Sequence, residues 1–235
     1  MRDFETHASA AFDEYALEYD AALEKGISVS GEHKDYFAHG RIAWLSRCLR
    51  EINERPASVM DFGCGTGSGT PHFFDLLNAE LLLGVDSSVR SLEVAQRNFG
   101  SANARFELFS DYQPSGTIDL SFCNGVFHHI PPEERREAVS YVHRSLRSGG
   151  LFAFWENNPW NPGTRYVMSR IPFDRDAIPL SPPVARKLLV EGGFQILRTD
   201  FQFIFPKALS WFRAIEPHVA QLPFGAQYQV LCRKN

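Results

Sequence analysis

Four glycines at alternate positions follow a short apolar segment, and this feature constrains the fold of the chain more than any other. The segment is Val59-Met60-Asp61-Phe62, the loop from Gly63 to Gly69 reads Gly-Cys-Gly-Thr-Gly-Ser-Gly, and apolar residues at helical spacing follow it. Glycine allows positive φ angles and lets a ligand approach the backbone, and a helix N-terminus offers unpaired N–H groups. A strand, this loop and a helix therefore predict an α/β fold with a ligand at the turn.

The spacing of the glycines indicates which kind of ligand the loop suits. A plain turn between a strand and a helix needs fewer glycines. Position 68 is Ser and position 70 is Thr, so the dinucleotide pattern G-x-G-x-x-G fails when it is counted from Gly63 and again from Gly65. The Gly-Lys-Ser/Thr ending of a phosphate-binding loop is missing as well. The sequence therefore favours a cofactor without a pyrophosphate group.

Asp86 ends the next apolar segment and lies 19 residues after Gly67. A carboxylate at this place can accept hydrogen bonds from both hydroxyl groups of a ribose. The alternative is an N-cap of the following helix, a role that Ser87 or Ser88 could fill instead. Together with the glycine loop, the position of Asp86 favours the ribose role.

Short apolar segments alternate with helical patterns from Ser58 onward, which is typical of βαβ units on a parallel sheet. Ser148-Gly149-Gly150 is expected to end the helix before the fifth strand. The last two strands are expected to pair antiparallel, because the segment between them is short of signals for a crossover. The prediction is a three-layer α/β sandwich with a seven-stranded, mostly parallel sheet whose last strand is antiparallel. The predicted strands are 58–62, 81–85, 105–109, 118–123, 151–155, 194–205 and 227–233.

The chain before Ser58 has a helical pattern. We expect residues 1–55 to form an N-terminal helical cap or lid, and residues 56–235 to form one Rossmann-like domain. A segment at about 157–181 is longer than a typical loop between a strand and a helix, and it is expected to be an insertion on the substrate side. A further helical stretch is expected from Lys207 to about Ala220. One apolar helix face is formed by Ala38, Ile42, Leu45, Leu49 and Ile52.

Composition excludes several classes of function. The chain has 24 Lys and Arg against 28 Asp and Glu, so its net charge of -4 does not attract nucleic acid. No run approaches the roughly 20 apolar residues that cross a bilayer, and the first residues lack the order of a signal peptide. We therefore expect a cytoplasmic protein without membrane insertion or a nucleic-acid partner. The four cysteines lie far apart, so reduced thiols are expected, and neither disulfides nor a metal site is indicated.

The ordered motifs resemble those of the class I, or Rossmann-like, S-adenosylmethionine-dependent methyltransferases in their small-molecule branch. The resemblance covers about Ser58 to Phe205. It implies S-adenosylmethionine as cofactor, S-adenosylhomocysteine as product, and a small-molecule acceptor of the methyl group, bound by a monomer or homodimer. The matching motifs are Asp-Phe-Gly-Cys-Gly-Thr-Gly, Leu-Gly-Val-Asp-Ser-Ser, Ile-Asp-Leu-Ser-Phe-Cys-Asn-Gly-Val-Phe-His-His-Ile and Leu-Arg-Ser-Gly-Gly.

The resemblance assigns contacts with the cofactor. The glycine loop would wrap the methionine portion, and Asp111 with Tyr112 would contact the adenine, although Asp111 could also be a solvated turn residue. Tyr15 and Tyr19 share one helix face; Tyr19 would close on the cofactor and Arg41 would pair with its carboxylate, unless the tyrosines only pack onto the sheet. The expected cofactor contacts are Asp61, Gly63, Cys64, Gly65, Gly67, Asp86, Ser87, Asp111, Tyr112, Asn124, Tyr19 and Arg41.

Methyl transfer from a sulfonium is an in-line displacement, which needs alignment of the acceptor and in some cases removal of a proton. The fourth predicted strand leads into Asn124-Gly-Val-Phe-His-His-Ile130, and such folds place their chemistry at the ends of parallel strands. His129 is the first candidate for a general base and His128 the second; a packing role for either is the alternative. The expected acceptor contacts, each of which could instead hold an irregular loop or pack a helix, are Glu156, Asn157, Trp160, Arg165 and Tyr15.

Two other functions compete with a methyltransferase. A catalytically silent partner subunit would keep the cofactor site without turnover. A nicotinamide-dependent oxidoreductase is disfavoured, because the third glycine of the loop is displaced and the chain has no Tyr-x-x-x-Lys pair. The intact glycines, Asp86 and the polar end of the fourth strand favour the enzyme.

Overall fold

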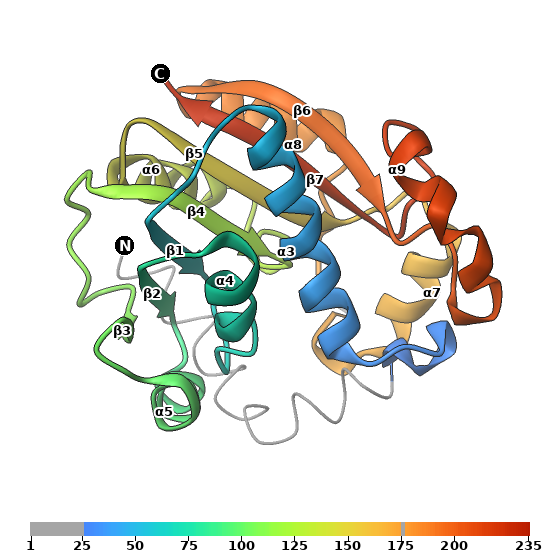
Figure 1. Ribbon diagram of the computed structural model, residues 1–235, viewed down its shortest axis with the longest axis horizontal. Helices are drawn as coiled ribbons and strands as arrows, with labels where there is room; N and C mark the ends of the chain where they lie inside the picture. Colours follow the sequence, from blue (N-terminus) through green and yellow to red (C-terminus); the bar gives the residue numbers. More distant parts are fainter. Residues whose placement is uncertain (1–25, 175–176) are drawn as a thin grey trace.

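The computed structural model describes residues 26–174 and 177–235, in which seven strands form one sheet (Figure 1). The order in the sheet is β3-β2-β1-β4-β5-β7-β6, and β7 is antiparallel to both of its neighbours. The predicted sheet, mostly parallel with an antiparallel last strand, is thereby confirmed. The strands are β1 (Ser58–Phe62), β2 (Leu81–Asp86), β3 (Ala104–Leu108), β4 (Ile118–Asn124), β5 (Leu146–Asn157), β6 (Phe194–Gln202) and β7 (Gln227–Lys234).

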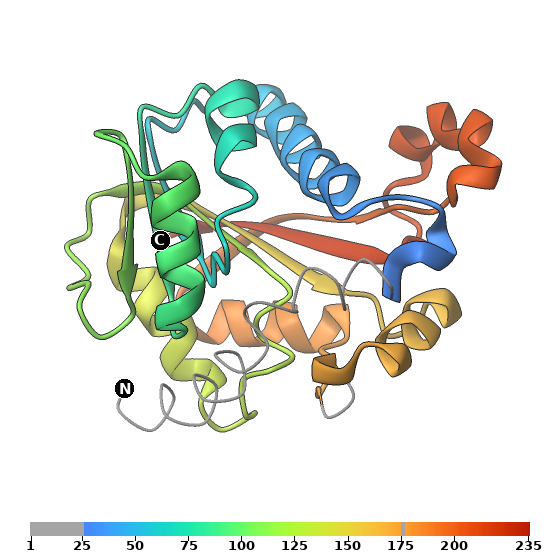
Figure 2. The same ribbon diagram turned by 90° about the horizontal axis from the view of Figure 1, so that it is seen from below.

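Helices cover both faces of the sheet. Figure 2 shows α3 and α4 on one side and α6 and α8 on the other, and an apolar cluster joins each pair to its face. All four cysteines are buried and form no disulfide in the structure. None of the helices in the described ranges is long and apolar enough to cross a membrane. The helical elements are η1 (Ser28–Ser30), α3 (Lys34–Glu51), α4 (Thr70–Leu77), α5 (Val89–Phe99), α6 (Arg135–Ser145), α7 (Pro162–Arg170), η2 (Pro172–Asp174), α8 (Pro182–Glu191), η3 (Lys207–Ile215) and α9 (Glu216–Val219).

The strand order reverses between β1 and β4. From β1 the sheet extends outward through β2 to β3, and the chain then returns to add β4 on the other side of β1. The carboxyl ends of the strands at such a reversal leave a crevice, because the connections that follow them go to opposite faces of the sheet. Gly63 follows β1 and Asn124 ends β4, so both predicted loops border the same crevice.

One predicted boundary is wrong at the start of β5. The helix α6 ends at Ser145 and β5 begins at Leu146, so Gly149 and Gly150 lie inside a strand instead of ending a helix. The pairing of β5 with β4 shifts its register over this stretch, and Gly149 has a φ of +72°. The two glycines therefore allow an irregularity in the pairing of β5 with β4. The sequence pattern does not distinguish this from the end of a helix.

The segment after β6 also differs from the prediction. β6 ends at Gln202 rather than Phe205, because Phe203 has a φ of +62°, outside the extended region that a strand requires. The helical stretch predicted to run to about Ala220 consists of the 3₁₀ segment η3, kinked at Leu209, and the single turn α9. This arrangement carries the chain away from the sheet before it returns as β7.

The helix α3 is tied to the far edge of the sheet by a buried carboxylate. Trp44 Nε1 donates a hydrogen bond to Asp200 Oδ2 in β6 at 3.1 Å, and Arg198 Nε donates to the same oxygen at 2.6 Å. Asp200 is fully buried. The predicted apolar face of this helix packs against the sheet, whereas the domain boundary at residue 55 stays a prediction. The fully packed residues of that face are Ala38, Ile42, Leu45 and Leu49.

The variant Asp200→Ala is expected to lower the free energy of unfolding by about 1–3 kcal/mol, because it leaves a buried indole N–H without an acceptor. Urea unfolding followed by circular dichroism measures the loss. Arg136→Ala is the control, since it breaks an exposed ion pair in which the side chain of Arg136 is 75% exposed and that of Glu191 is 37% exposed. The expected change in the free energy of unfolding is under about 0.5 kcal/mol. Equal losses in the two variants would contradict the anchoring role of Asp200.

Candidate functional site

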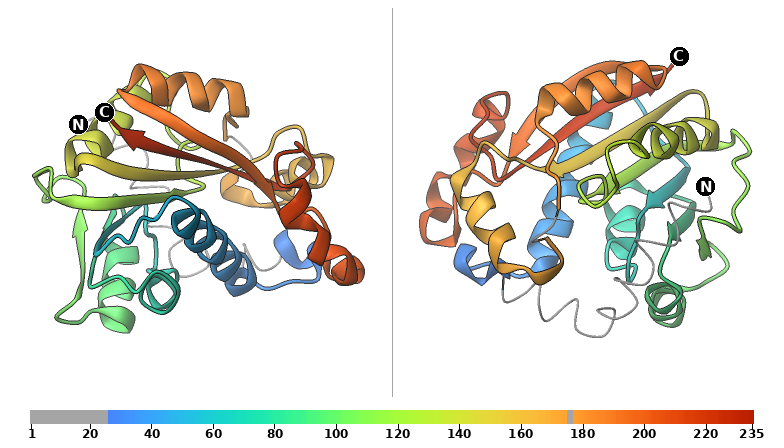
Figure 3. Two further views of the ribbon diagram at one scale, coloured as in Figure 1. Left: turned by 45° about the horizontal axis from the view of Figure 1, so that its top comes forward. Right: turned by 180° about the vertical axis from the view of Figure 1, so that it is seen from behind.

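A cavity of about 470 Å³ opens at the carboxyl edge of the sheet. Its walls come from the loop after β1 (63–66), the loop after β4 (124–125 and 128–129), η1, α3, α7 and the end of β6. Figure 3 shows the segment that contains η1, the helix α7 and the segment η3–α9 gathered beyond this end of the strands. Segments far apart in the sequence therefore meet around the crevice that the reversed strand order creates.

The glycine loop presents its backbone to this cavity. Gly63 and Gly65 have φ angles of +74° and +52°. A Cβ atom on Gly63 would clash with Cγ2 of Val126, so the loop after β4 packs directly on this residue. A Cβ atom on Gly65 would meet no atom within 4 Å among the described residues, so this glycine borders open space. Gly63 is required for packing between the two loops, and Gly65 leaves room for a ligand.

Asp86 holds the glycine loop from the end of β2. Its Oδ2 accepts a hydrogen bond from Gly65 N at 2.8 Å, and its Oδ1 accepts one from Ser88 N at 2.9 Å. The N-cap of α5 is Ser88, whose Oγ accepts from Ser91 N at 3.1 Å, so Asp86 does not cap the helix. A carboxylate has about four lone-pair positions, and Asp86 is only half-buried.

Asp61 and Arg41 place two opposite charges behind the glycine loop. Burial, together with the charge of Asp86, raises the pKa of Asp61 to about 7, although Arg41 acts in the opposite direction. Arg41 Nη1 donates to Gln227 Oε1 at 3.0 Å, and Gln227 Nε2 donates to Asn157 Oδ1 at 3.1 Å. Arg41, Gln227 and Asn157 all line the cavity, so this chain of hydrogen bonds forms one of its walls.

The end of β4 supplies a buried acceptor without a partner. Asn124 lines the cavity, and its Oδ1 makes no hydrogen bond within the described part of the chain. A buried polar oxygen without a partner is costly, so a ligand or water normally satisfies it. Asn124 therefore marks a place where a bound molecule can donate a hydrogen bond.

Several predicted cofactor contacts do not line the cavity. Asp111 is exposed and accepts from Ser110 Oγ, and Tyr112 is buried in the core near the ring of Tyr141. Ser87 is half-buried beside Asp86. Roles for these residues in adenine or ribose binding stay predictions. Tyr15 and Tyr19 lie outside the described residues.

Glu156 fixes the loop that carries the two histidines. Its fully buried carboxylate accepts from Phe127 N at 2.8 Å and lies 2.6 Å from His128 Nδ1. Burial disfavours the imidazolium form of His128, but the charges of Glu156 and Asp174 more than offset this and raise the pKa of His128 to about 10. Among the residues predicted to touch the acceptor, Glu156 thus lies beneath the cavity wall and supports it.

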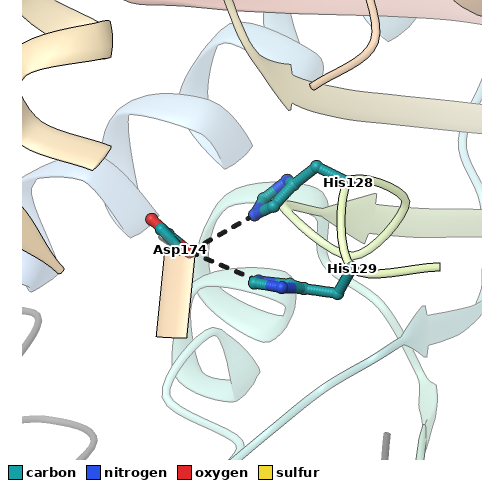
Figure 4. Close-up of side chains that lie close together, drawn as sticks. All are labelled: His128, His129 and Asp174. Carbon is teal, nitrogen blue, oxygen red and sulfur yellow. Dashed lines mark ion pairs between the residues drawn. The ribbon is translucent and has the colours of Figure 1, made fainter. Parts of the chain in front are cut away.

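His129 lies beside the same carboxylate as His128. Figure 4 shows both rings directed at Asp174, whose Oδ1 lies 3.3 Å from His129 Nε2 and 3.5 Å from His128 Nε2. Burial lowers the pKa of His129 below its ordinary value, and the opposing effect of Asp174 does not restore it. Both histidines and Asp174 line the cavity. A general-base role for His129 stays a prediction.

The remaining predicted acceptor contacts divide into two groups. Asn157 lines the cavity, whereas Trp160, which is 52% exposed, and Arg165, which is exposed, do not. The cavity instead contains residues that the sequence analysis did not single out for a functional role, and only Asp174 fell within a segment already expected to lie over the site. These additional lining residues include Tyr36, Phe37, Asp174, Phe203, Phe205, Arg213 and Gln227.

Comparisons with known proteins agree with this architecture. The family described as "Methyltransferase domain" matches residues 59–150. A trans-aconitate 2-methyltransferase from Deinococcus radiodurans is 37% identical over 103 residues, which cover 43% of this chain and 39% of the relative. An uncharacterized methyltransferase from Bacillus cereus is 25% identical over 199 residues, which cover 84% of this chain and 81% of the relative. The chain thus spans well under half the length of the first of these relatives.

Solved structures share the whole fold. The magnesium protoporphyrin IX methyltransferase from Synechocystis PCC 6803, solved with bound S-adenosylhomocysteine, has a TM-score of 0.63 at 19% identity and covers 98% of this chain and 99% of its own. An S-adenosylmethionine-dependent methyltransferase from Mesorhizobium loti has a TM-score of 0.56 at 19% identity, covering 80% and 96%. In its sheet and its glycine loop, and over the matched residues 59–150, the chain is similar to the class I S-adenosylmethionine-dependent methyltransferases, whose fold it shares.

Proposed function

We propose that this protein transfers a methyl group from S-adenosylmethionine to a small-molecule acceptor bound in the cavity at the carboxyl edge of the sheet. The observation that carries the proposal is that one cavity is bordered both by the glycine loop and by aromatic side chains, among them Tyr36, Phe37 and Phe203. A donor on the glycine loop and an acceptor against these rings would therefore share one cavity. Such positioning is the main requirement of an in-line methyl transfer.

The residues present fit the cofactor. Open space beside Gly65, the unsatisfied acceptor Oδ1 of Asn124 and the carboxylate of Asp86 at the end of β2 are features that suit a ligand with an amino acid group and a ribose. When bound, S-adenosylmethionine supplies a methyl group on a positively charged sulfur. Asp86 would accept from the ribose hydroxyls, and Arg41 and Asp61 would face the carboxylate and the ammonium group.

The charges of the cavity support an acceptor with an anionic or oxygen-rich group on an apolar body. Lys34 and Arg213 line the cavity, and Nη2 of Arg213 is buried without a hydrogen bond among the described residues, although Nη1 pairs with Glu32 at 2.9 Å. Two of the relatives are named for acidic acceptors, trans-aconitate and malonyl-[acyl-carrier protein]. A guanidinium N–H without a partner favours an oxygen of this kind.

The test of the proposed function is acceptor-dependent formation of S-adenosylhomocysteine. Purified protein is incubated with S-adenosylmethionine and a panel of small carboxylic acids and phenols, and the products are identified by mass spectrometry. The expected result is a methylated acceptor together with equimolar S-adenosylhomocysteine. Cofactor binding without turnover on any acceptor would favour the silent partner subunit, and tight binding of NAD would favour the oxidoreductase. The [4+2]-cyclase SpnF, a fold neighbour with a TM-score of 0.58 at 15% identity, illustrates why the fold does not replace this assay.

Replacement of Asp86 by alanine is expected to weaken binding of S-adenosylhomocysteine by about 10- to 100-fold, because hydrogen bonds to a charged acceptor contribute about 1.5–3 kcal/mol. Isothermal titration calorimetry measures the affinity. The matched control is Glu93→Ala, which removes an exposed carboxylate from α5 and should leave affinity unchanged. Unchanged affinity in a folded Asp86→Ala protein would contradict the proposal that Asp86 binds the ribose.

Cofactor binding is expected to strengthen as pH rises toward 7. The pKa of Asp61 is about 7 without ligand, and a neighbouring ammonium group lowers it, so the bound form is ionised and binding releases a proton. Affinity therefore increases between the lower pKa of the complex and about 7, and it levels off above. Calorimetry in buffers of different ionisation enthalpy counts the released proton. Asp61→Asn should abolish both the slope and the release; a slope that persists in this variant would assign it to another group.

A further inference from the structure

Three side chains with metal-binding atoms converge at the cavity. His128 and His129 follow β4, and Asp174 ends η2, some 45 residues later in the chain. Their potential ligand atoms all lie within 4.8 Å of one another, and Oδ1 of Asp174 is 3.5 Å and 3.3 Å from the two Nε2 atoms (Figure 4). These distances exceed the roughly 2.7–2.9 Å of a charge-assisted hydrogen bond. Neighbouring ligands of an ion bound at about 2.1 Å lie about 3.0–3.4 Å apart, so the 3.3 Å distance falls within this spacing and the 3.5 Å distance slightly exceeds it.

We propose that His128, His129 and Asp174 bind a divalent transition-metal ion, of the class of Zn²⁺, at the wall of the cavity. Two imidazoles and one carboxylate form a set that such ions prefer, whereas Mg²⁺ and Ca²⁺ prefer oxygen ligands alone. The three residues supply three ligands, and the cavity that they line leaves the remaining coordination positions accessible.

Glu156 strengthens the case because it orients one of the ligands. A histidine that binds a metal through one ring nitrogen almost always donates the N–H of the other to a carboxylate or carbonyl. His128 Nδ1 lies 2.6 Å from Glu156 Oε2, which leaves Nε2 directed at Asp174 and the cavity. The carboxylate of Glu156 is itself held by Phe127 N at 2.8 Å. The arrangement is a carboxylate, a histidine and an open ligand position, built into the ends of β4 and β5.

The local charge also suits a cation. The rings of His128 and His129 lie 4.1 Å apart, and the buried carboxylates of Glu156 and Asp174 lie on either side of His128. A bound ion would displace the proton from His128, and the two carboxylates would then balance its two positive charges. Buried charges are tolerated when they are paired or bind a metal.

The role of the ion in catalysis rests on the proposed function, whereas its binding does not. Its open positions face the space where the acceptor would lie, so the ion would hold an acceptor oxygen as a Lewis acid. His129 Nε2 cannot bind the ion and accept a proton at once. A bound ion would therefore take the place of the general-base role predicted for His129, and it would favour acceptors with a carboxylate, phenol or enol oxygen.

The experiment is a titration of the full-length, EDTA-treated protein with Co²⁺, followed by its visible absorption, and with Zn²⁺ in competition. The expected result is saturable binding of one equivalent of Co²⁺ that Zn²⁺ displaces and Mg²⁺ does not. Glu156→Gln should weaken binding by about 10- to 100-fold through loss of the oriented ring. His129→Gln and Asp174→Asn should abolish binding, and retained affinity for S-adenosylhomocysteine reports that each variant is folded.

His72→Gln is the matched control. His72 also lies beside a carboxylate, with Nε2 2.9 Å from Asp35 Oδ1, and beside a second ring, that of His39 at 5.5 Å. Binding of Co²⁺ should be unchanged in this variant. Absence of saturable binding by the unmodified protein, or equal binding by the Asp174→Asn variant, would overturn the proposal. Methyl transfer that continues in EDTA would refute the catalytic role alone, and metal binding without methyl transfer would refute the proposed function alone.

Discussion

The reversal of strand order between β1 and β4 is the constraint on which the rest of the structure depends. Because the chain turns outward after β1 and returns beside it as β4, the loops after these two strands diverge and leave a crevice. The contact between Gly63 and Val126 packs the two loops against each other at its base. A cofactor site at the loop after β1 and the two histidines of the loop after β4 can then border one cavity.

Two carboxylates, the half-buried Asp86 and the fully buried Glu156, hold the loops around this cavity in place. Asp86 binds Gly65 N and holds the glycine loop, while Glu156 binds Phe127 N and the ring of His128 and holds the opposite loop. Each links the ends of two strands that are neighbours in the sheet and follow one another in the chain with a helix between them. The same carboxylates have a second use, since Asp86 can accept from a ribose and Glu156 orients the histidine in the proposed metal site. Structure and function thus depend on the same hydrogen bonds.

Much of the fold and the part of the site expected to bind the cofactor could be predicted from local sequence. The glycine loop and Asp86 lie at the ends of adjacent strands with fixed spacing, so their proximity follows from the βαβ unit itself. The boundaries around Gly149 and Phe203 could not be predicted, because a glycine pair serves a helix end and a strand irregularity equally well, and a positive φ at phenylalanine leaves no sequence signal. The residues that would contact the methyl acceptor were harder still to predict. Trp160 and Arg165 have the expected composition for a binding loop, yet neither lines the cavity.

The sequence by itself determined the α/β class, the strand ends that carry the candidate functional residues, and the kind of cofactor expected. These features depend on residues that are close together in the chain. Only the tertiary structure brought Asp174 to the two histidines, Arg213 and Phe203 to the cavity wall, and Trp44 to Asp200. These contacts join elements that no repeat or spacing relates, since loops after different strands converge through the packing of the sheet and its helices. The ligand set of the proposed metal site is therefore a property of the folded chain alone.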